Sequence, residues 1–551
     1  NVSEADMYPL FSNLVMLVAH HAKQAVEAHS AGGSSKPKVT HKEGSMPVTP
    51  GLVLPLNDDK SGIGNRYRYY SRDNEEIDEN GVNIIGALTL RRLSSSIGPQ
   101  GRQKYSNIFS VVKMRRWSTG SSNSYVAIAK HTQRVYAAQI ERRYAWGLTL
   151  CGTEARIILF HHDGVRVSPV IDISELDGIK MLVTILVHWS FCSPERLGYD
   201  PSIAWNEETS NWEILCANSE GSYNPTPYVI TRTLYGASTL FGRHTRCFLV
   251  RRKDGGNNNR ETVLKSSWSL PFDRTNVTDS YAVVSNEMDI LRHIARVLGS
   301  RNQNYIFPQV VLGGEVRLLK GDEYVTDDTT QIYEYDGWEE QQAFRVYRHL
   351  NMSPVGHPLN SAENEEELVL VLADVMEFHN AIFEQCNVLH RDISVNNILV
   401  VRDFEGQSAS QPVRGLLIDY DHAVRTDQRY RSYSRRSGSL PFMSIHNLEA
   451  HESERTALDD WESLLYVICW LATFGINQAD RETIGRAGGS NLPTDQPSAE
   501  QPDRDPLVLR KENENAIIGT LLEAIQIASA EAQTRLARRA ANEGNTAAPA
   551  Q

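Results

Sequence analysis

The clearest pattern along the chain is a set of apolar residues at helical spacing. Residues 363–385 carry one apolar stripe, and the acidic run at residues 363–367 suits the positive N-terminal end of a helix. Residues 5–29 and 515–541 predict two further helices. A helix that begins at Leu458 has apolar residues on nearly every face, so we expect it to be fully buried.

Shorter apolar runs predict strands. In the first part of the chain they surround a helix expected at residues 127–142 and precede another at residues 179–191. The predicted strands lie at residues 107–112, 146–150, 155–161, 212–216, 228–235, 240–250, 262–265, 307–316 and 344–349. The presence of both element types favours an α+β protein.

The composition narrows the class of protein. A net charge of -12 gives no basic field, so no nucleic-acid partner is expected. The six cysteines form no C-x-x-C pair, which is typical of reduced thiols in an intracellular protein of the cytoplasm or nucleus. No apolar run approaches the roughly 20 residues of a membrane span, so no membrane association is expected. The chain starts at Asn1 without Met, so a removed targeting segment stays an open alternative.

One stretch carries the candidate chemistry. Residues 388–401 read V-L-H-R-D-I-S-V-N-N-I-L-V-V, in which Asp392 and Asn397 have the spacing of the phosphotransferase loop H-R-D-x-x-x-x-N. This spacing lets a carboxylate accept a proton from an attacking hydroxyl while an amide oxygen on the same turn reaches a magnesium ion. A β-hairpin with a polar turn is the alternative interpretation.

Two acidic residues extend this site. Asp419 ends the apolar run 416–418, where the metal-binding Asp of a D-F-G motif would stand, and with Asn397 it would hold magnesium between nucleotide phosphates. Asp460, at the start of the last buried helix, is expected to accept hydrogen bonds from the backbone of the catalytic loop and so to hold Asp392 in place.

A lysine and a glutamate upstream fit the same chemistry. Lys265 closes an apolar strand, and Glu287 follows about twenty residues later on a helix, so its carboxylate can orient the ammonium toward phosphates. A surface lysine near an unrelated glutamate is the alternative. Gly242 lies where a phosphate-covering hairpin would be, although a full G-x-G-x-x-G motif is absent.

Three other features have two interpretations each. Residues 422–440, rich in Arg and Ser, are either a solvated basic loop or an activation segment whose phosphorylated hydroxyls are ordered by arginines such as Arg391. His379 shares the stripe of its helix and is expected to be a packed histidine, not a ligand. Lys113, with Gln133 and Tyr136, faintly resembles a decayed nuclease site, but the acidic metal ligands are missing, which favours a docking module.

Together these motifs resemble the fungal-type protein kinases, a divergent branch of the protein-kinase fold. The resemblance covers about residues 100–475. The stretches that carry it are residues 389–394, 397–399, 417–421, 440–445, 264–268, 242–245, 146–148 and 197–201.

The resemblance implies a two-lobed protein-kinase-like fold preceded by a smaller mixed α/β module. The expected divisions are an N-terminal helix (1–30), a linker (31–65), an α/β accessory module (66–204), the kinase N-lobe (205–357), the kinase C-lobe (358–480) and a low-complexity tail with one helix (481–551).

The resemblance also implies an ATP-dependent Ser/Thr protein kinase that uses magnesium and acts on a protein substrate. The implied site residues are Asp392 as base, Arg391 beside it, Asn397 and Asp419 on the metal, and Lys265, Glu287 and Gly242 at the nucleotide phosphates. The identity of the substrate and the oligomeric state stay open.

Three departures from ordinary protein kinases keep rival interpretations open. Ser394 replaces the lysine that neutralises the γ-phosphate, Asp421 replaces the glycine of D-F-G, and His446 replaces the glutamate of A-P-E, which forms a buried ion pair. One rival is a pseudokinase or scaffold that binds nucleotide or partners with little turnover. A small-molecule kinase is a third possibility.

Overall fold

The structure, a computed structural model, describes most of the chain between residues 108 and 474 and the C-terminal helix. The described residues are 11, 14, 15, 17, 18, 21, 67–71, 86–90, 108–115, 121–218, 226–237, 239–255, 260–269, 286–299, 305–320, 323–329, 345–404, 407–427, 438–449, 455–474 and 506–546.

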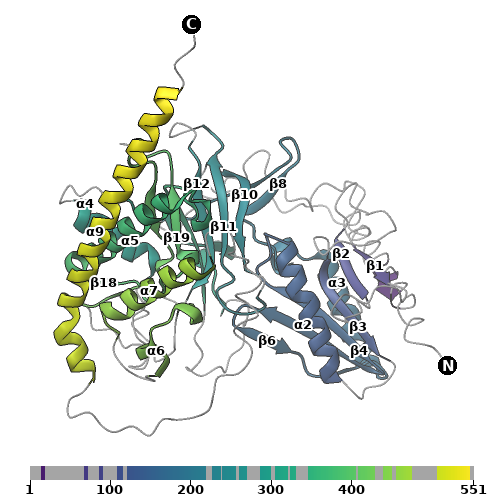
Figure 1. Ribbon diagram of the computed structural model, residues 1–551. Helices are drawn as coiled ribbons and strands as arrows, with labels where there is room; N and C mark the ends of the chain where they lie inside the picture. The colour runs from purple at the N-terminus through teal and green to yellow at the C-terminus, as the bar shows by residue number, and fades with distance from the viewer. Residues whose placement is uncertain are drawn as a thin grey trace. The chain divides into compact units, whose positions relative to one another are not determined.

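The chain forms two compact units, and each is described by itself. Unit 1 comprises Asn1–Leu270 and Leu312–Leu350, and unit 2 comprises Pro271–Val311 and Asn351–Gln551. Both contain strands and helices, so the protein is a mixed α/β structure (Figure 1). The predicted two-lobed arrangement and the domain boundaries stay predictions.

Unit 1 begins with a seven-stranded sheet in the order β1-β2-β3-β4-β5-β6, with β7 beside β5. Its strands are β1 (Tyr67–Ser71), β2 (Gly86–Leu90), β3 (Ile108–Arg115), β4 (Ala145–Cys151), β5 (Glu154–His161), β6 (Gly164–Val167) and β7 (Ile171–Asp172). Because α2 (Ser121–Ala138) crosses over between them, β3 and β4 run parallel, whereas the other pairs are antiparallel. We call this sheet, with α2 and α3 (Leu176–Phe191), the front module.

Apolar side chains cover both faces of the front sheet. On one face, Ile128 and Val135 of α2 pack with Ile158 and Phe160 of β5. On the other face, residues of α3 pack on the sheet together with Phe11 and Val15 from the helical residues near the N-terminus. A sheet buried on both faces explains why its strands read as continuous apolar runs instead of alternating ones.

The second sheet of the chain has the order β13-β16-β12-β11-β10-β9-β8. Its strands are β8 (Ile203–Asn206), β9 (Asn211–Ile214), β10 (Tyr228–Gly236), β11 (Arg246–Arg252), β12 (Thr262–Ser269), β13 (Gln309–Glu315) and β16 (Val346–Ser353), and the two-stranded β14 (Arg317–Lys320) and β15 (Glu323–Thr326) follow β13. Within unit 1, β8 to β12 form an antiparallel meander, which needs only short connections.

A buried ion pair joins the front module to the segment after β15. The guanidinium of Arg143 donates from Nε to Asp327 at 2.6 Å, and a second nitrogen bonds the other carboxylate oxygen. Both side chains are almost fully buried, 4% and 0% exposed. Burial raises the pKa of Asp327 to about 6 even though Arg143 lowers it. Loss of either partner would leave a charge without compensation in the interior.

Unit 2 is built around the helix α5 (Glu365–Cys386). The side chain of Asn364 caps its N-terminus by accepting from the amide of Glu367, and Asn387 ends it in the left-handed conformation. Around it lie α4 (Glu287–Gly299), α6 (Ile445–Glu449), α7 (Ala457–Phe474), α9 (Pro506–Thr546) and the small sheets β17 (His357–Pro358)-β19 (Ile398–Val401)-β20 (Arg414–Leu417) and β18 (Val388–Leu389)-β21 (Val424–Arg425).

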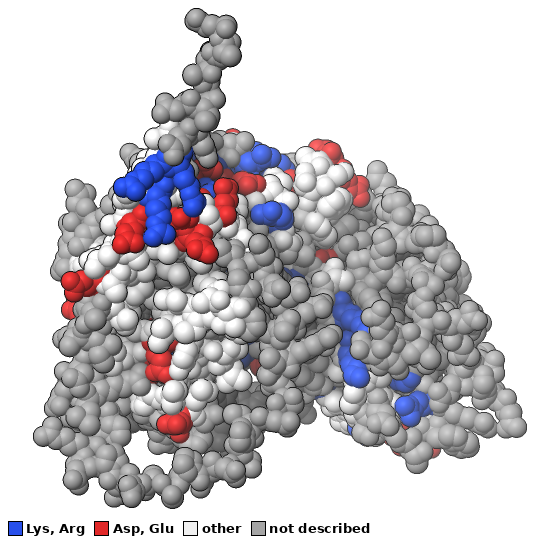
Figure 2. Space-filling view, in the orientation of Figure 1, with Lys and Arg blue, Asp and Glu red and all other residues white. Residues whose placement is uncertain are grey.

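The C-terminal helix α9 lies along α5. Its residues Ala532 and Leu536 are buried, and Arg539 forms two hydrogen bonds of 3.1 and 3.0 Å with the carboxylate of Glu366. Figure 2 shows basic and acidic side chains gathered side by side where these helices meet. Among the described residues, no helix is both long and apolar enough to cross a membrane.

Within the described residues, most predicted elements are present with shifted ends. Most of the helix predicted at residues 5–29 and the whole linker predicted at 31–65 lie outside the described residues. The helix expected at residues 127–142 spans Ser121–Ala138. Its first four residues, S-S-N-S, are polar, so apolar periodicity did not mark its start. The expectation that the helix from Leu458 is fully buried was wrong, since Leu465 on α7 is 48% exposed. Residues 428–437 of the segment 422–440 lie outside the described residues.

We predict that unit 1 loses stability in acid. Burial lowers the pKa of His244 to about 3 and that of His349 to about 4, from 6.5. Below pH 6.5 the unfolded chain therefore binds protons that the folded chain does not bind. The contribution of these histidines to the free energy of unfolding is at its maximum above that pH and decreases below it. Each histidine should cost about 1.4 kcal/mol per pH unit. Urea unfolding at several pH values measures this slope.

A matched variant tests the origin of the slope. His244 has a φ of 44°, a conformation that asparagine tolerates, so His244→Asn should fold while removing one titrating group. Its free energy of unfolding should fall less steeply with decreasing pH than that of the wild type. Parallel pH curves for the two proteins would contradict the prediction.

Candidate functional site

The stretch 388–401 forms a strand, a loop and a second strand in unit 2. After α5, β18 leads into the loop at His390, and the 3-10 turn Val395–Asn397 leads into β19. β19 pairs with β20, with Ile398 opposite Leu417, and the amide of Ile418 donates to the carbonyl of Asn397 at 2.9 Å. The pairing therefore brings Asn397 and Asp419 to the same end of one hairpin.

Asp460 of α7 holds the backbone of the loop by hydrogen bonds. One carboxylate oxygen accepts from the amide of His390 at 2.8 Å, and the other accepts from the amide of Arg391 at 2.9 Å. These bonds satisfy two backbone donors that the loop conformation would leave buried, and Arg391 has a φ of 69°. The prediction that Asp460 holds the catalytic-loop backbone is confirmed.

His379 is a second partner of Asp460. Its Nε2 lies 2.9 Å from the carboxylate, and its ring packs edge-on against Trp461. Burial by itself raises the pKa of Asp460, but the hydrogen bond and charge of His379, with the bond from the amide of His390, hold that pKa below its ordinary value. The histidine is packed, as expected, and it also keeps the anchoring carboxylate charged.

Asp392 is oriented by contacts on both sides. Its Oδ1 accepts from the amide of Ser439 at 2.9 Å and from the hydroxyl of Ser439 at 3.0 Å. Its backbone carbonyl accepts from the side-chain amide of Asn397 at 2.8 Å. Asn397 uses its nitrogen for this bond, so its side-chain oxygen is the atom that can bind a cation. The chain thus brings together the predicted base and one predicted metal ligand.

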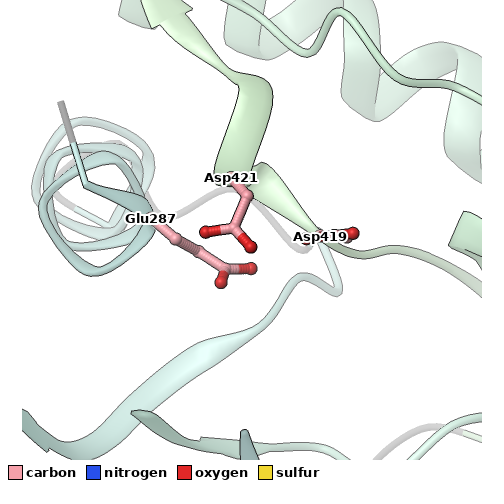
Figure 3. A group of neighbouring side chains, drawn as sticks. All are labelled: Glu287, Asp419 and Asp421. Atoms are coloured by element: carbon pink, nitrogen blue, oxygen red, sulfur yellow. The ribbon is translucent and has the colours of Figure 1, made fainter. Parts of the chain in front are cut away.

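Three carboxylates meet beside this hairpin. One carboxylate oxygen from each of Glu287, Asp419 and Asp421 lies within 4.8 Å of the other two. Figure 3 shows Glu287 reaching from α4 toward Asp421, with Asp419 beside them. Glu287 is also held by the amide of Tyr420, which donates to it at 3.0 Å. Asp419 takes a φ of 67°, which turns the chain sharply between the two aspartates.

This set of donors fits a magnesium ion. Carboxylate and amide oxygens are the hard ligands that magnesium prefers, and no thiol or imidazole belongs to the group. Three carboxylates so close together repel one another unless a cation compensates them. Asp421 was expected to bring another carboxylate near the metal, and it does lie within the cluster.

The remaining predicted residues lie in unit 1. Lys265 is buried on β12 opposite Cys247 of β11, and Gly242 lies in the loop between β10 and β11. The pairing of Lys265 with Glu287, which belongs to unit 2, stays a prediction.

At the position of the glutamate of an A-P-E motif the chain has His446, which contacts an acidic residue. His446 lies 3.2 Å from Asp459 of α7, and the same carboxylate oxygen accepts from the hydroxyl of Ser444 at 2.6 Å. His446 of α6 and Asp459 of α7 thus form a local contact where the sequence lacks the A-P-E glutamate.

Sequence reasoning missed two residues of the site. Ser439 touches the predicted base, and Arg455 donates to the carbonyl of Arg391 at 3.0 Å. Burial lowers the pKa of Arg455 to about 10, and the charge of Arg391 adds to this effect. The stretch Gly438-Ser439 before an apolar turn was the only available signal for Ser439, and no sequence pattern marks Arg455.

Comparison with known families identifies this arrangement. A family model described as fungal protein kinase matches residues 88–472, more than half of the chain. The chain belongs to the fungal protein kinase family. The match includes the loop of Asp392, the strands of unit 1 from β3 onward and most of α7. No curated protein matches the chain.

We predict that Asp460, on α7, is the most costly single polar residue to change among those that contact the kinase loop. Asp460→Asn presents an amide NH₂ where an oxygen accepts from a backbone amide, so one buried donor loses its partner. The variant should lose about 2–4 kcal/mol of unfolding free energy, measured by urea denaturation.

Asp427→Asn is the matched control. Asp427 pairs with Arg425 at 2.6 Å, but its side chain is 38% exposed, so its loss should cost under about 1 kcal/mol. Equal destabilisation of both variants would show that Asp460 does not anchor the loop.

Proposed function

We propose that this fungal protein kinase is an active, ATP-dependent Ser/Thr kinase that acts on a protein substrate. The observation that carries the proposal is the convergence of Asp392, Asn397 and Asp419 at one end of the β19–β20 hairpin, with the loop backbone fixed by Asp460. A chain that had lost catalysis would not need so many contacts to orient one carboxylate.

Asp392 acts as the base in this proposal. Its Oδ1 is committed to Ser439, so Oδ2 accepts the proton of the incoming hydroxyl. A serine hydroxyl already lies at hydrogen-bond distance from this carboxylate, which supports an aliphatic hydroxyl as the acceptor group. The oxygen of that hydroxyl then attacks the γ-phosphorus of ATP, whose bond to the β-γ bridging oxygen breaks.

Magnesium, when bound, neutralises charge between the nucleotide phosphates. In this chain, Asn397 and Asp419 would hold it, and Asp421 would add a carboxylate that ordinary kinases lack. Lys265, paired with Glu287, would bind the phosphates, and Gly242 would lie over them. Catalysis then rests on positioning and electrostatic stabilisation more than on covalent chemistry.

A nucleotide-binding scaffold with little turnover is the second candidate. Ser394 favours it, because its side chain is buried and its hydroxyl has no hydrogen-bond partner among the described residues. A lysine in that position would bring a positive charge to the transferring phosphate. The retained base and metal ligands favour the active kinase over this candidate.

An intracellular location follows as part of the proposal. None of the six cysteines forms a disulfide, and Cys386 and Cys216 are buried where oxidants reach them poorly. Burial raises the pKa of Cys216, which keeps it protonated and inert. Protein phosphorylation by ATP also needs the nucleotide pool of the cell interior.

We predict that Asp392→Asn and Asp419→Ala each lower phosphate transfer by at least about 10²-fold, because one removes the base and the other a metal ligand. Transfer of radiolabelled phosphate from ATP to a mixed protein substrate by the purified full chain measures this. Asp427→Asn, which changes an exposed acid, is the control and should match the wild type.

Equal phosphate transfer by the wild type and all variants would mean that a contaminating enzyme transfers the phosphate. A rise in melting temperature with ATP and magnesium, but no turnover by the wild type, would favour the scaffold instead.

A further inference from the structure

The loop between β10 and β11 is fastened to the front module. We call residues 239–245 the hairpin loop. The amide of Gly242 donates to the carbonyl of His162 at 2.8 Å, and Gly242 has a φ of 104°, which a residue with a side chain adopts only under strain. Leu240 packs against the core of the module formed by α2 and the front sheet. Both contacts lie within unit 1.

A stack of rings extends this contact. The ring of His162 stacks on that of His244 with centroids 4.4 Å apart, and it lies 5.2 Å from the ring of Trp268. Both ring nitrogens of His162 are buried and have no hydrogen-bond partner among the described residues. His162 therefore contributes an aromatic surface and a backbone carbonyl, and its nitrogens contribute nothing that a phenyl ring would lose.

Further hydrogen bonds connect the hairpin loop and the front module to the strands around Lys265. The amide of Trp268, three residues after Lys265, donates to the carbonyl of Arg243 at 2.7 Å. Arg246, beside Cys247, which pairs with Lys265, donates from its guanidinium to the carbonyl of Tyr136 on α2 at 2.6 Å. Carbonyls of the front module thus hold the hairpin loop and β11, and the ring of His162 lies against Trp268 at the end of β12.

We propose that the front module is a positioning element for nucleotide binding, and that His162 is its main contact with the hairpin loop and the Lys265 strand. The inference rests on the proposed function. A loop that must close over a nucleotide loses conformational freedom when the nucleotide binds, and this loss weakens affinity. In this protein the front module orders the hairpin loop before nucleotide binds. The loop therefore loses its conformational freedom when the protein folds, not when nucleotide binds.

The test uses two pairs of variants of the full chain. His162→Ala removes the stacked ring and His162→Phe keeps it; Leu240→Ser removes the apolar anchor and Leu240→Met keeps it. Neither residue is assigned a contact with nucleotide or substrate: Leu240 lies in the hairpin loop, but its side chain packs against the front module. Amide hydrogen exchange of residues 239–247 and 262–268 measures how firmly the loop and strand are held, and titration with ATP and magnesium measures affinity.

The expected result is faster exchange in both segments for His162→Ala and Leu240→Ser. Their dissociation constants for nucleotide should rise roughly tenfold, equivalent to about 1.4 kcal/mol of lost preorganisation. The KM for ATP should rise in parallel, while kcat should change less than about twofold, because the catalytic loop of unit 2 is untouched. His162→Phe and Leu240→Met should match the wild type in every measurement.

Three results would overturn the inference, and they are distinguishable. Unchanged exchange in His162→Ala and Leu240→Ser would show that the module does not hold the loop. Faster exchange with unchanged nucleotide affinity would show that the fastening has no role in binding, and would leave the kinase proposal standing. A wild type that binds no nucleotide would remove the proposed function and this inference together.

Discussion

The site depends on one interaction, the acceptance of two backbone amides by the two oxygens of Asp460. A catalytic loop must leave helix and sheet geometry to present its side chains, so its amides lose their regular partners. A buried carboxylate on α7 supplies two acceptors at once, and His379 forms a further hydrogen bond with it. The position of Asp392 follows from this contact, because the anchored residues immediately precede it in the chain.

Charge is distributed unusually around this anchor. A carboxylate is added at Asp421, and the lysine that would stand at Ser394 is absent, so the loop and the hairpin are more negative than in ordinary kinases. Such a site repels nucleotide phosphates unless a cation is bound, which makes the proposed chemistry strongly dependent on the metal. Positive charge near the site comes from Arg391 in the loop and from Arg455, which donates to the carbonyl of Arg391.

The front module and the β8–β12 meander behave as one folded unit. The ion pair of Arg143 with Asp327, the bond from Arg246 to Tyr136 and the rings around His162 are all buried. Polar groups buried in this way resist separation, since each would need a new partner. The module is therefore an integral part of this region and differs from an appended docking domain on a flexible linker.

The sequence by itself determined the elements, the family resemblance and the residues of the kinase loop. Apolar periodicity and fixed spacings such as that of Asp392 and Asn397 are local properties of the chain, so they can be recognised in the sequence without a structure. Only the tertiary structure decided that Ser439 touches Asp392, that His446 pairs with Asp459 and that His162 meets the hairpin loop. These contacts join residues 13 to 82 positions apart, and no local pattern encodes which distant side chains packing brings together.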